Sequence, residues 1–142
     1  MENKVIENLV EKAIEARNMA YAPYSGFKVG AALLDASGGI HLGCNIENAA
    51  YSPTNCAERT AFFKAVSEGE RDFAAIAVAG GPRDAREDEL VNAFPCGVCR
   101  QVMKEFCGDD FIIVSAKSPR DYRILTLKEI LPEAFGPADL GR

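Results

Sequence analysis

The stretch F-I-I-V-S-A-K-S-P-R-D-Y-R-I-L-T at residues 111–126 contains two apolar runs separated by a short polar turn. The runs at 111–115 and 122–126 predict two β-strands. Only about seven residues, 116–122, join these runs, whereas a crossover to a parallel strand needs about a dozen or more. We therefore expect the two strands to pair antiparallel, as the last hairpin of a sheet.

Upstream of this hairpin, the hydrophobic pattern alternates between helix and strand periods. The turn A-S-G-G predicts a hairpin, and Asn55 and Gly69 are expected to cap the two ends of a helix. The predicted elements before the last hairpin are a helix at 3–19, strands at 27–35 and 40–47, a helix at 56–68, a buried strand at 73–79, a mobile charged loop at 81–93 and a helix at about 96–107. A short helix at 127–131 follows the hairpin. This order predicts an α/β fold of three layers, α/β/α, with a mixed five-stranded sheet in a single domain over residues 1–142.

The composition favours small-molecule chemistry over nucleic-acid binding. The 142 residues are 48% hydrophobic and carry a formal net charge of −5, with no cluster of Lys and Arg to contact phosphates. No apolar run approaches the roughly 18 residues of a membrane span, and no secretory signal is visible. We therefore expect a cytoplasmic protein without nucleic-acid or membrane partners, whose 5 cysteines are thiols or metal ligands rather than disulfides.

Three of the cysteines have the spacing of metal ligands. Cys96 and Cys99 form a C-x-x-C pair on one face of a predicted helix start. Cys56 begins another predicted helix, and helix N-termini favour thiolate over thiol. Three thiolates leave the fourth position of a tetrahedral zinc ion open. For C-x-x-C alone, a redox pair or two core thiols are the alternatives.

A closed structural zinc site is a further alternative, because two more cysteines are available. Cys107 follows Cys99 by eight residues, or about 12 Å along a helix, which is too far for Zn–S bonds of about 2.3 Å. Spacing does not exclude Cys44, although a buried strand thiol is its commoner fate. His41, the single histidine, is expected to be an unligated strand residue.

Glu58 favours a catalytic metal site over a structural one. It lies two residues after Cys56, and zinc-assisted hydrolysis needs a carboxylate that takes a proton from water and passes it to the leaving group. The alternative role, stabilisation of the helix dipole, would suffice for a glutamate standing alone. A non-catalytic zinc module has no use for an acid at this position.

These motifs together resemble those of the zinc-dependent cytidine deaminases. C-A-E at 56–58 followed by P-C-G-V-C at 95–99 is similar to the signature in which hydroxide on zinc attacks C4 of cytosine. Y-S-G-F-K-V-G-A-A-L at 24–33, N-I-E-N-A-A-Y at 45–51 and L-P-E-A-F at 131–135 resemble the small homotetrameric members of the family. The resemblance covers nearly the whole chain.

The resemblance implies a reaction and assigns roles to individual residues. It implies hydrolysis of cytidine and deoxycytidine to uridine and deoxyuridine with release of ammonia, a step of pyrimidine salvage. One Zn²⁺ per subunit and Glu58 as the proton shuttle would perform it. Asn45 and Glu47 match residues that bind the ribose hydroxyls, and Phe27 matches one that packs near the sugar and base. Ala57 matches a residue that bonds the pyrimidine through its backbone.

Two further residues are assigned by the same resemblance. Phe135 resembles an aromatic residue that reaches into a neighbouring subunit's site, and Arg59 resembles one that donates hydrogen bonds to cysteine sulfurs. Their alternatives are a packing residue of the C-terminal segment and an exposed helix arginine. The antiparallel last hairpin is similar to that of free-nucleoside deaminases, whereas relatives acting on RNA or DNA have parallel last strands. Another aminopyrimidine substrate, such as a nucleoside antibiotic or a nucleotide, stays open because pocket shape sets substrate choice.

Overall fold

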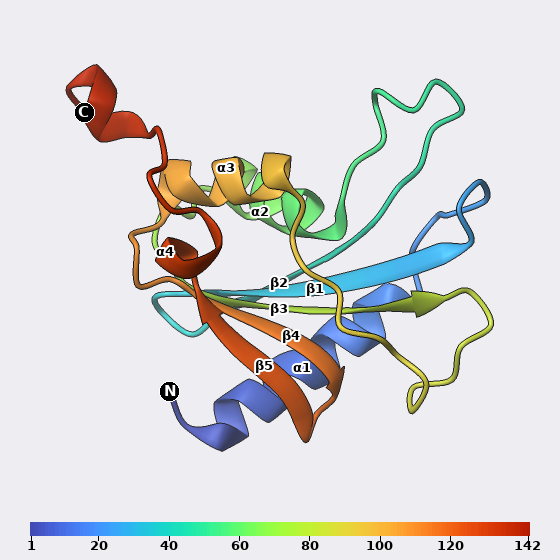
Figure 1. Ribbon diagram of the computed structural model, residues 1–142. Coiled ribbons are helices and arrows are strands. Elements are labelled where there is room, and N and C mark those ends of the chain that lie inside the picture. Colours follow the sequence, from blue (N-terminus) through green and yellow to red (C-terminus); the bar gives the residue numbers. More distant parts are fainter.

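The computed structural model describes residues 1–142, whose strands form one mixed sheet (Figure 1). The strands are β1 (Phe27–Asp35), β2 (Ile40–Cys44), β3 (Phe73–Pro82), β4 (Ile112–Ser118) and β5 (Asp121–Thr126). They lie in the order β2-β1-β3-β4-β5 in a 5-stranded sheet. β3 and β4 are parallel, and every other neighbouring pair is antiparallel. The mixed sheet and its antiparallel last hairpin are therefore confirmed.

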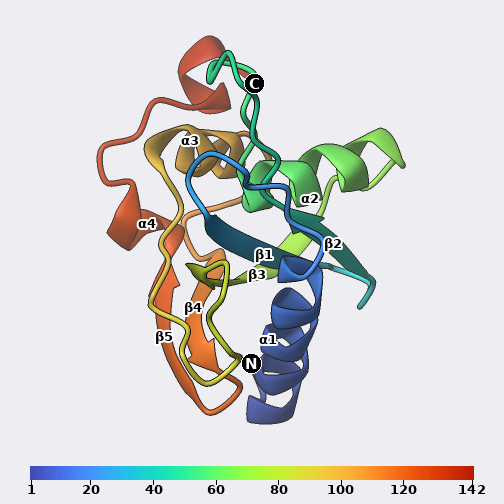
Figure 2. The same ribbon diagram turned by 90° about the vertical axis from the view of Figure 1, so that its right-hand side faces the viewer.

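Helices cover both faces of this sheet, as Figures 1 and 2 show. Helix α1 (Asn3–Arg17) lies on one face, and α2 (Ala57–Ser67) and α3 (Gly97–Phe106) lie side by side on the other. Helix α4 (Leu127–Ile130) and a 3-10 turn (Pro137–Leu140) follow β5. The three-layer α/β/α arrangement is thus confirmed. None of the helices combines the length and the apolar character that crossing a membrane requires.

Strand β3 shows how the apolar core is divided between the two faces. Successive side chains of a strand point to opposite sides of the sheet. Ala75 and Ala77 belong to the apolar cluster under α1, whereas Ile76 and Val78 belong to the cluster under α2 and α3. All four are fully buried. A strand covered on both faces has no polar alternation, which explains the unbroken apolar run in the sequence.

The N-terminus of α2 rests directly on the backbone of β2. A Cβ atom on Gly43 would lie 2.4 Å from the carbonyl oxygen of Ala57 and 2.5 Å from the backbone nitrogen of Ala61. Only glycine permits this approach, because any side chain would push the helix away. The contact sets the position of the helix start, which carries Cys56 and Glu58.

Strand β2 ends earlier than the sequence predicted, and this changes the surroundings of Asn45 and Glu47. The prediction placed residues 40–47 in the strand, but β2 stops at Cys44. Beyond this point the chain no longer pairs with β1 as a strand. Ile46 instead forms isolated bridges with Tyr21 and with Asn55. The predicted end of the first helix at residue 19 is also late, since α1 ends at Arg17.

Asn55 is not the N-cap of α2, which corrects the prediction from sequence. The cap position is Cys56, and its side chain makes no capping hydrogen bond. The backbone N–H and C=O of Asn55 are both bonded to Ile46, which holds Asn55 extended outside the helix. Its side-chain amide donates instead to Thr60 Oγ1 at 3.1 Å. A long-range backbone bridge has thus overridden a local capping preference.

The charged stretch 81–93, expected to be a loop, is partly packed against the sheet. Strand β3 extends into it as far as Pro82. Leu90 is only 5% exposed and joins the apolar cluster under α1. The backbone N–H of Val91 donates to the carbonyl of Gly80 at 3.0 Å. Apolar residues within a polar run therefore anchor the end of this loop.

Candidate active site and metal centre

The sulfur atoms of Cys56, Cys96 and Cys99 converge at the N-termini of α2 and α3. Cys56 and Cys96 occupy the N-cap positions of these two helices, and Cys99 lies in the first turn of α3. The three Sγ atoms all lie within 4.8 Å of one another. The sequence placed the two motifs at helix starts, and the packing of α2 beside α3 brings those starts together.

The distances between the sulfurs fit a tetrahedral zinc ion. Cys56 Sγ and Cys96 Sγ are 3.7 Å apart, and Cys96 Sγ and Cys99 Sγ are 3.6 Å apart. Zn–S bonds of about 2.3 Å in tetrahedral geometry place two sulfurs about 3.8 Å apart. No other His, Cys, Asp or Glu side chain joins the group. The residues present are therefore a suitable three-thiolate metal site.

The other two cysteines stand outside this cluster. Cys44 is half-buried on the edge strand β2, and Cys107 follows the last turn of α3. Burial raises the pKa of both thiols, to about 12 for Cys107. These two side chains are thus kept as neutral thiols.

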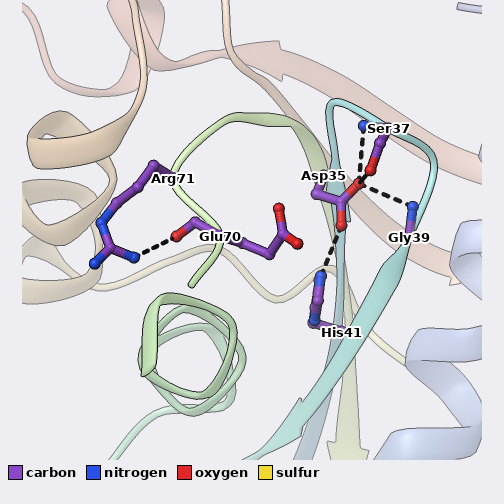
Figure 3. A network of polar contacts seen from close by, with 6 residues as sticks. All are labelled: Asp35, Ser37, Gly39, His41, Glu70 and Arg71. Atoms are coloured by element: carbon purple, nitrogen blue, oxygen red, sulfur yellow. Dashed lines mark hydrogen bonds and ion pairs between the residues drawn. The ribbon is translucent and has the colours of Figure 1, made fainter. Parts of the chain in front are cut away.

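His41 lies away from the cluster, on β2 just after the turn that joins it to β1, so it is an unligated strand residue as predicted (Figure 3). Its Nε2 atom is 2.9 Å from Asp35 Oδ2. Asp35 Oδ1 accepts hydrogen bonds from the hydroxyl and backbone N–H of Ser37 and from the backbone N–H of Gly39. These donors, His41 first among them, hold the pKa of the buried Asp35 far below its usual range. The sequence did not predict this pairing.

The three clustered thiols are electrostatically unequal. The pKa of Cys56 is lowered to about 5, chiefly by a hydrogen bond with Cys99 and further by Arg59. The pKa of the fully buried Cys99 is raised, first by its bond with Cys56 and then by burial. Arg59 Nη2 donates to Cys56 Sγ at 3.3 Å, while the buried Arg59 Nε has no partner. The thiolate at the start of α2 therefore has a guanidinium beside it.

Glu58 is a buried acid next to the cluster. It is 4% exposed and lies in the first turn of α2. Burial raises its pKa to about 7. A carboxyl group of this kind can exchange protons near neutral pH, which is the property that general acid–base chemistry requires.

A cavity of about 420 Å³ opens beside Glu58, Cys56 and Cys96. Its lining contains most of the residues that the sequence singled out: Phe27, Asn45, Glu47, Cys56, Ala57, Glu58 and Cys96. The amide of Asn45 is also part of the fold, because its Nδ2 donates to the Phe27 carbonyl and its Oδ1 accepts from the Val29 N–H, each at 2.8 Å. The strand predicted at 40–47 would have included Asn45 and Glu47, but both follow the end of β2 at Cys44 and still reach the cavity.

Several lining residues were not predicted from the sequence. They are Val29, Thr54, Asn55, Val78, Ala93 and Phe94. Val78 could have been found because successive side chains of a strand point to opposite faces of the sheet, which places Val78 on the face that α2 covers. The ring of Phe94 lies under the guanidinium of Arg123 on β5, 5.3 Å from its carbon, and no local sequence signal indicates this pairing.

Phe135 lies apart from the cavity of its own subunit. Its side chain is 60% exposed on the C-terminal segment. The backbone carbonyl of Phe135 accepts from Gln101 Nε2 at 2.9 Å, which ties this segment to α3. The structure thus displays an aromatic ring on the surface rather than packing it internally.

The fold and the site together define an α/β enzyme class with a metal centre at two helix N-termini and a buried acid beside it. The protein-family model described as the cytidine and deoxycytidylate deaminase zinc-binding region matches residues 3–115. That span covers both cysteine motifs and Glu58.

Similar proteins of known name are cytidine deaminases. A cytidine deaminase of Sporosarcina psychrophila is 49% identical over 135 residues, covering 95% of this chain and 94% of that protein. A cytidine deaminase of Halalkalibacterium halodurans is 49% identical over 132 residues, covering 93% and 95%. The crystal structure of a Burkholderia pseudomallei cytidine deaminase has a TM-score of 0.80 and 46% identity, covering 90% and 97%. The chain belongs to the zinc-dependent cytidine and deoxycytidylate deaminase family.

Proposed function

We propose that the protein hydrolyses cytidine and deoxycytidine to uridine and deoxyuridine, with one water consumed and one ammonia released. The observation that carries the proposal is the buried Glu58 in the wall of a cavity of about 420 Å³, which Cys56 and Cys96 of the three-cysteine cluster also line. The named relatives, at up to 49% identity, are cytidine deaminases. Deoxycytidine is included because its pyrimidine ring, where the reaction takes place, is the same as that of cytidine.

Cys56, Cys96 and Cys99 would hold one zinc ion per subunit. When bound, zinc supplies Lewis acidity that makes a water a good nucleophile near neutral pH. The separation of the sulfurs supports this assignment. Arg59 would offset the negative charge of three thiolates through its hydrogen bond to Cys56.

Glu58 would carry the protons of the reaction. It takes a proton from the attacking water, gives one to N3 of the pyrimidine and delivers one to the departing amine. A single carboxyl group can serve all three steps if it lies on the side of the ring where the amine leaves. Its position in the first turn of α2, in the cavity wall with Cys56 and Cys96, supports this role.

The remaining cavity residues would bind and orient the nucleoside. The backbone of Ala57 would bond the pyrimidine, and Phe27 would pack against the base and sugar. Asn45 would donate to or accept from the ribose hydroxyls, and the Glu47 carboxylate would accept from them. All four residues line the same cavity. Asn45 keeps one N–H and one lone pair for substrate after its two bonds to β1.

Phe135 would complete the cavity of a neighbouring subunit in a homotetramer. Its large exposed fraction and its tether to α3 support this role. We also infer that the protein is one domain that acts in the cytoplasm, where its five cysteines, none of them in a disulfide, stay reduced.

A substrate panel tests the proposed function. Zinc-loaded protein is incubated with cytidine, deoxycytidine, dCMP and adenosine, and ammonia release is followed. We expect turnover of the first two compounds and little of the others. Preferential turnover of dCMP or of adenosine would replace the proposal with another aminopyrimidine or purine activity. Absence of turnover with zinc bound would point to a non-catalytic module.

A further inference from the structure

The carboxylate of Glu47 is held in place by the segment that precedes β1. Its Oε1 atom accepts from the backbone N–H groups of Tyr24, at 2.9 Å, and Ser25, at 3.1 Å. Its Oε2 atom accepts from the hydroxyl of Ser25. An ionised carboxylate offers about four lone-pair sites. These three bonds leave about one site, on Oε2, for a ligand.

The Ser25 hydroxyl links Glu47 to Phe27. The backbone N–H of Phe27 donates to Ser25 Oγ at 3.0 Å. An N–H can only donate, so the hydroxyl hydrogen is free to point at the Glu47 carboxylate. The chain of hydrogen bonds therefore runs from Phe27 through Ser25 to Glu47, and an ionised glutamate can accept all three bonds made to its carboxylate.

The backbone of Phe27 is tied on both sides by this arrangement. Its N–H is bonded to Ser25, and its carbonyl accepts from the amide of Asn45 at 2.8 Å. The backbone of Phe27 and the side chains of Asn45 and Glu47, all three residues of the cavity wall, thus belong to one hydrogen-bonded frame. Ser25 supplies the only side-chain link between Phe27 and Glu47 in that frame.

We propose that Ser25 is a positioning residue that fixes the Glu47 carboxylate, so that its free lone pair on Oε2 accepts a sugar hydroxyl of the nucleoside. The inference rests on the proposed function, because it names the residue that prepares the sugar subsite of that same site. The Ser25 hydroxyl also lowers the pKa of Glu47, ahead of the two backbone N–H groups. A carboxylate that is already ionised and aligned loses little freedom when a hydroxyl binds.

Kinetics of Ser25→Ala, Ser25→Thr and the control Ser67→Ala test this inference. Ser67 donates its hydroxyl to the Lys64 carbonyl at the far end of α2, so the control removes a comparable bond outside the cavity. With zinc-loaded protein and cytidine, we expect Ser25→Ala to raise KM roughly three- to tenfold, the usual worth of one such bond. Its kcat should stay near the wild-type value. Ser25→Thr, which keeps the hydroxyl, should restore KM.

A double variant separates an action through Glu47 from a general loosening of the loop. If Ser25 acts only through the carboxylate, Ser25→Ala should change KM little when Glu47 is already glutamine. Fully additive effects of Ser25→Ala and Glu47→Gln would overturn the inference. So would an unchanged KM in Ser25→Ala.

Carboxyl NMR titration supplies a readout that does not depend on activity. The Glu47 resonance of zinc-loaded protein without substrate should titrate at a higher pH in Ser25→Ala than in wild type or Ser67→Ala. An unchanged pKa would show that the hydroxyl does not hold the carboxylate. If wild-type protein turns over no cytidine, the proposed function is wrong, and this titration alone decides whether Ser25 holds Glu47.

Discussion

Arg59 Nη2 donates a hydrogen bond to Cys56 Sγ at 3.3 Å, across the first turn of α2. Three thiolates on Zn²⁺ leave a net charge of −1, whereas a site of one histidine and two cysteines would be neutral. The extra negative charge disfavours ionisation of water at the metal. A guanidinium bonded to one sulfur offsets part of that charge.

Arg59→Ala is therefore expected to lower zinc retention or kcat by roughly 10- to 100-fold, the usual effect of losing a donor to a metal ligand. Arg59→Gln should fall between, because it keeps some donors without the charge. For both variants, zinc content is measured after dialysis against a chelator, and kcat is measured on protein reloaded with zinc. Arg71→Ala is the control, since Arg71 bonds only the backbone carbonyls of Val66 and Glu70. Normal zinc content and kcat in Arg59→Ala would disprove the charge compensation.

Glu58→Gln should keep the fold and the zinc while losing turnover. The amide has nearly the same shape as the acid, so the buried position tolerates it, but it cannot transfer protons. We expect kcat to fall at least ~10²- to 10⁴-fold, because one group serves several proton transfers. Metal analysis and steady-state kinetics measure this. The exposed Glu105→Gln on α3 is the control. A zinc-loaded Glu58→Gln protein with full activity would rule out the proposed proton path.

Phe135→Ala should raise KM without unfolding the subunit, because the ring is 60% exposed and would act in a neighbour's cavity. Light scattering should give a tetramer for wild type and variant. Leu140→Ala, at a 72% exposed position of the same C-terminal segment, should leave KM unchanged. An active monomer of 15.3 kDa would contradict the tetramer, and an unchanged KM in Phe135→Ala would contradict only the role of the ring.

Single-stranded DNA and RNA should not bind at moderate salt. Non-specific affinity comes mostly from Lys and Arg that neutralise phosphates, and this chain carries a net charge of −5. Fluorescence anisotropy with labelled oligonucleotides measures the affinity, with cytidine turnover as proof of active protein. Micromolar binding would contradict the prediction and favour a polynucleotide substrate.

Asp35→Asn should destabilise the protein at neutral pH, and the difference from wild type should begin to shrink below about pH 4. The folded pKa of Asp35 is lowered by its bonds to His41, Ser37 and Gly39. Its contribution is therefore present above the unfolded pKa of about 3.9 and is lost as the pH falls through the folded value. Denaturant unfolding from pH 7 to pH 3 checks this, with the exposed Asp109→Asn as control. A difference that stays constant below pH 4 would contradict the assignment.

Local properties of the sequence determined the elements and the chemistry of the site. The short connection at 116–122 predicts the antiparallel last hairpin, because chain length alone forbids a crossover. The spacing of Cys96 and Cys99 predicts two ligands on one helical turn, because the period of a helix is fixed. Glu58 indicates hydrolysis because it lies two residues after Cys56, and residues so near in sequence are also near in space.

Only the tertiary structure decided how these parts meet. Cys56 reaches Cys96 because Gly43 lets α2 settle on β2, and no local pattern reports that contact. Burial, which comes from packing of the whole core, raises the pKa of Glu58 to about 7. Ile46 moves Asn45 and Glu47 out of the sheet by bridging to Tyr21 and Asn55. Long-range contacts of this kind depend on how strands and helices pack, and strand periodicity alone carries no information about them.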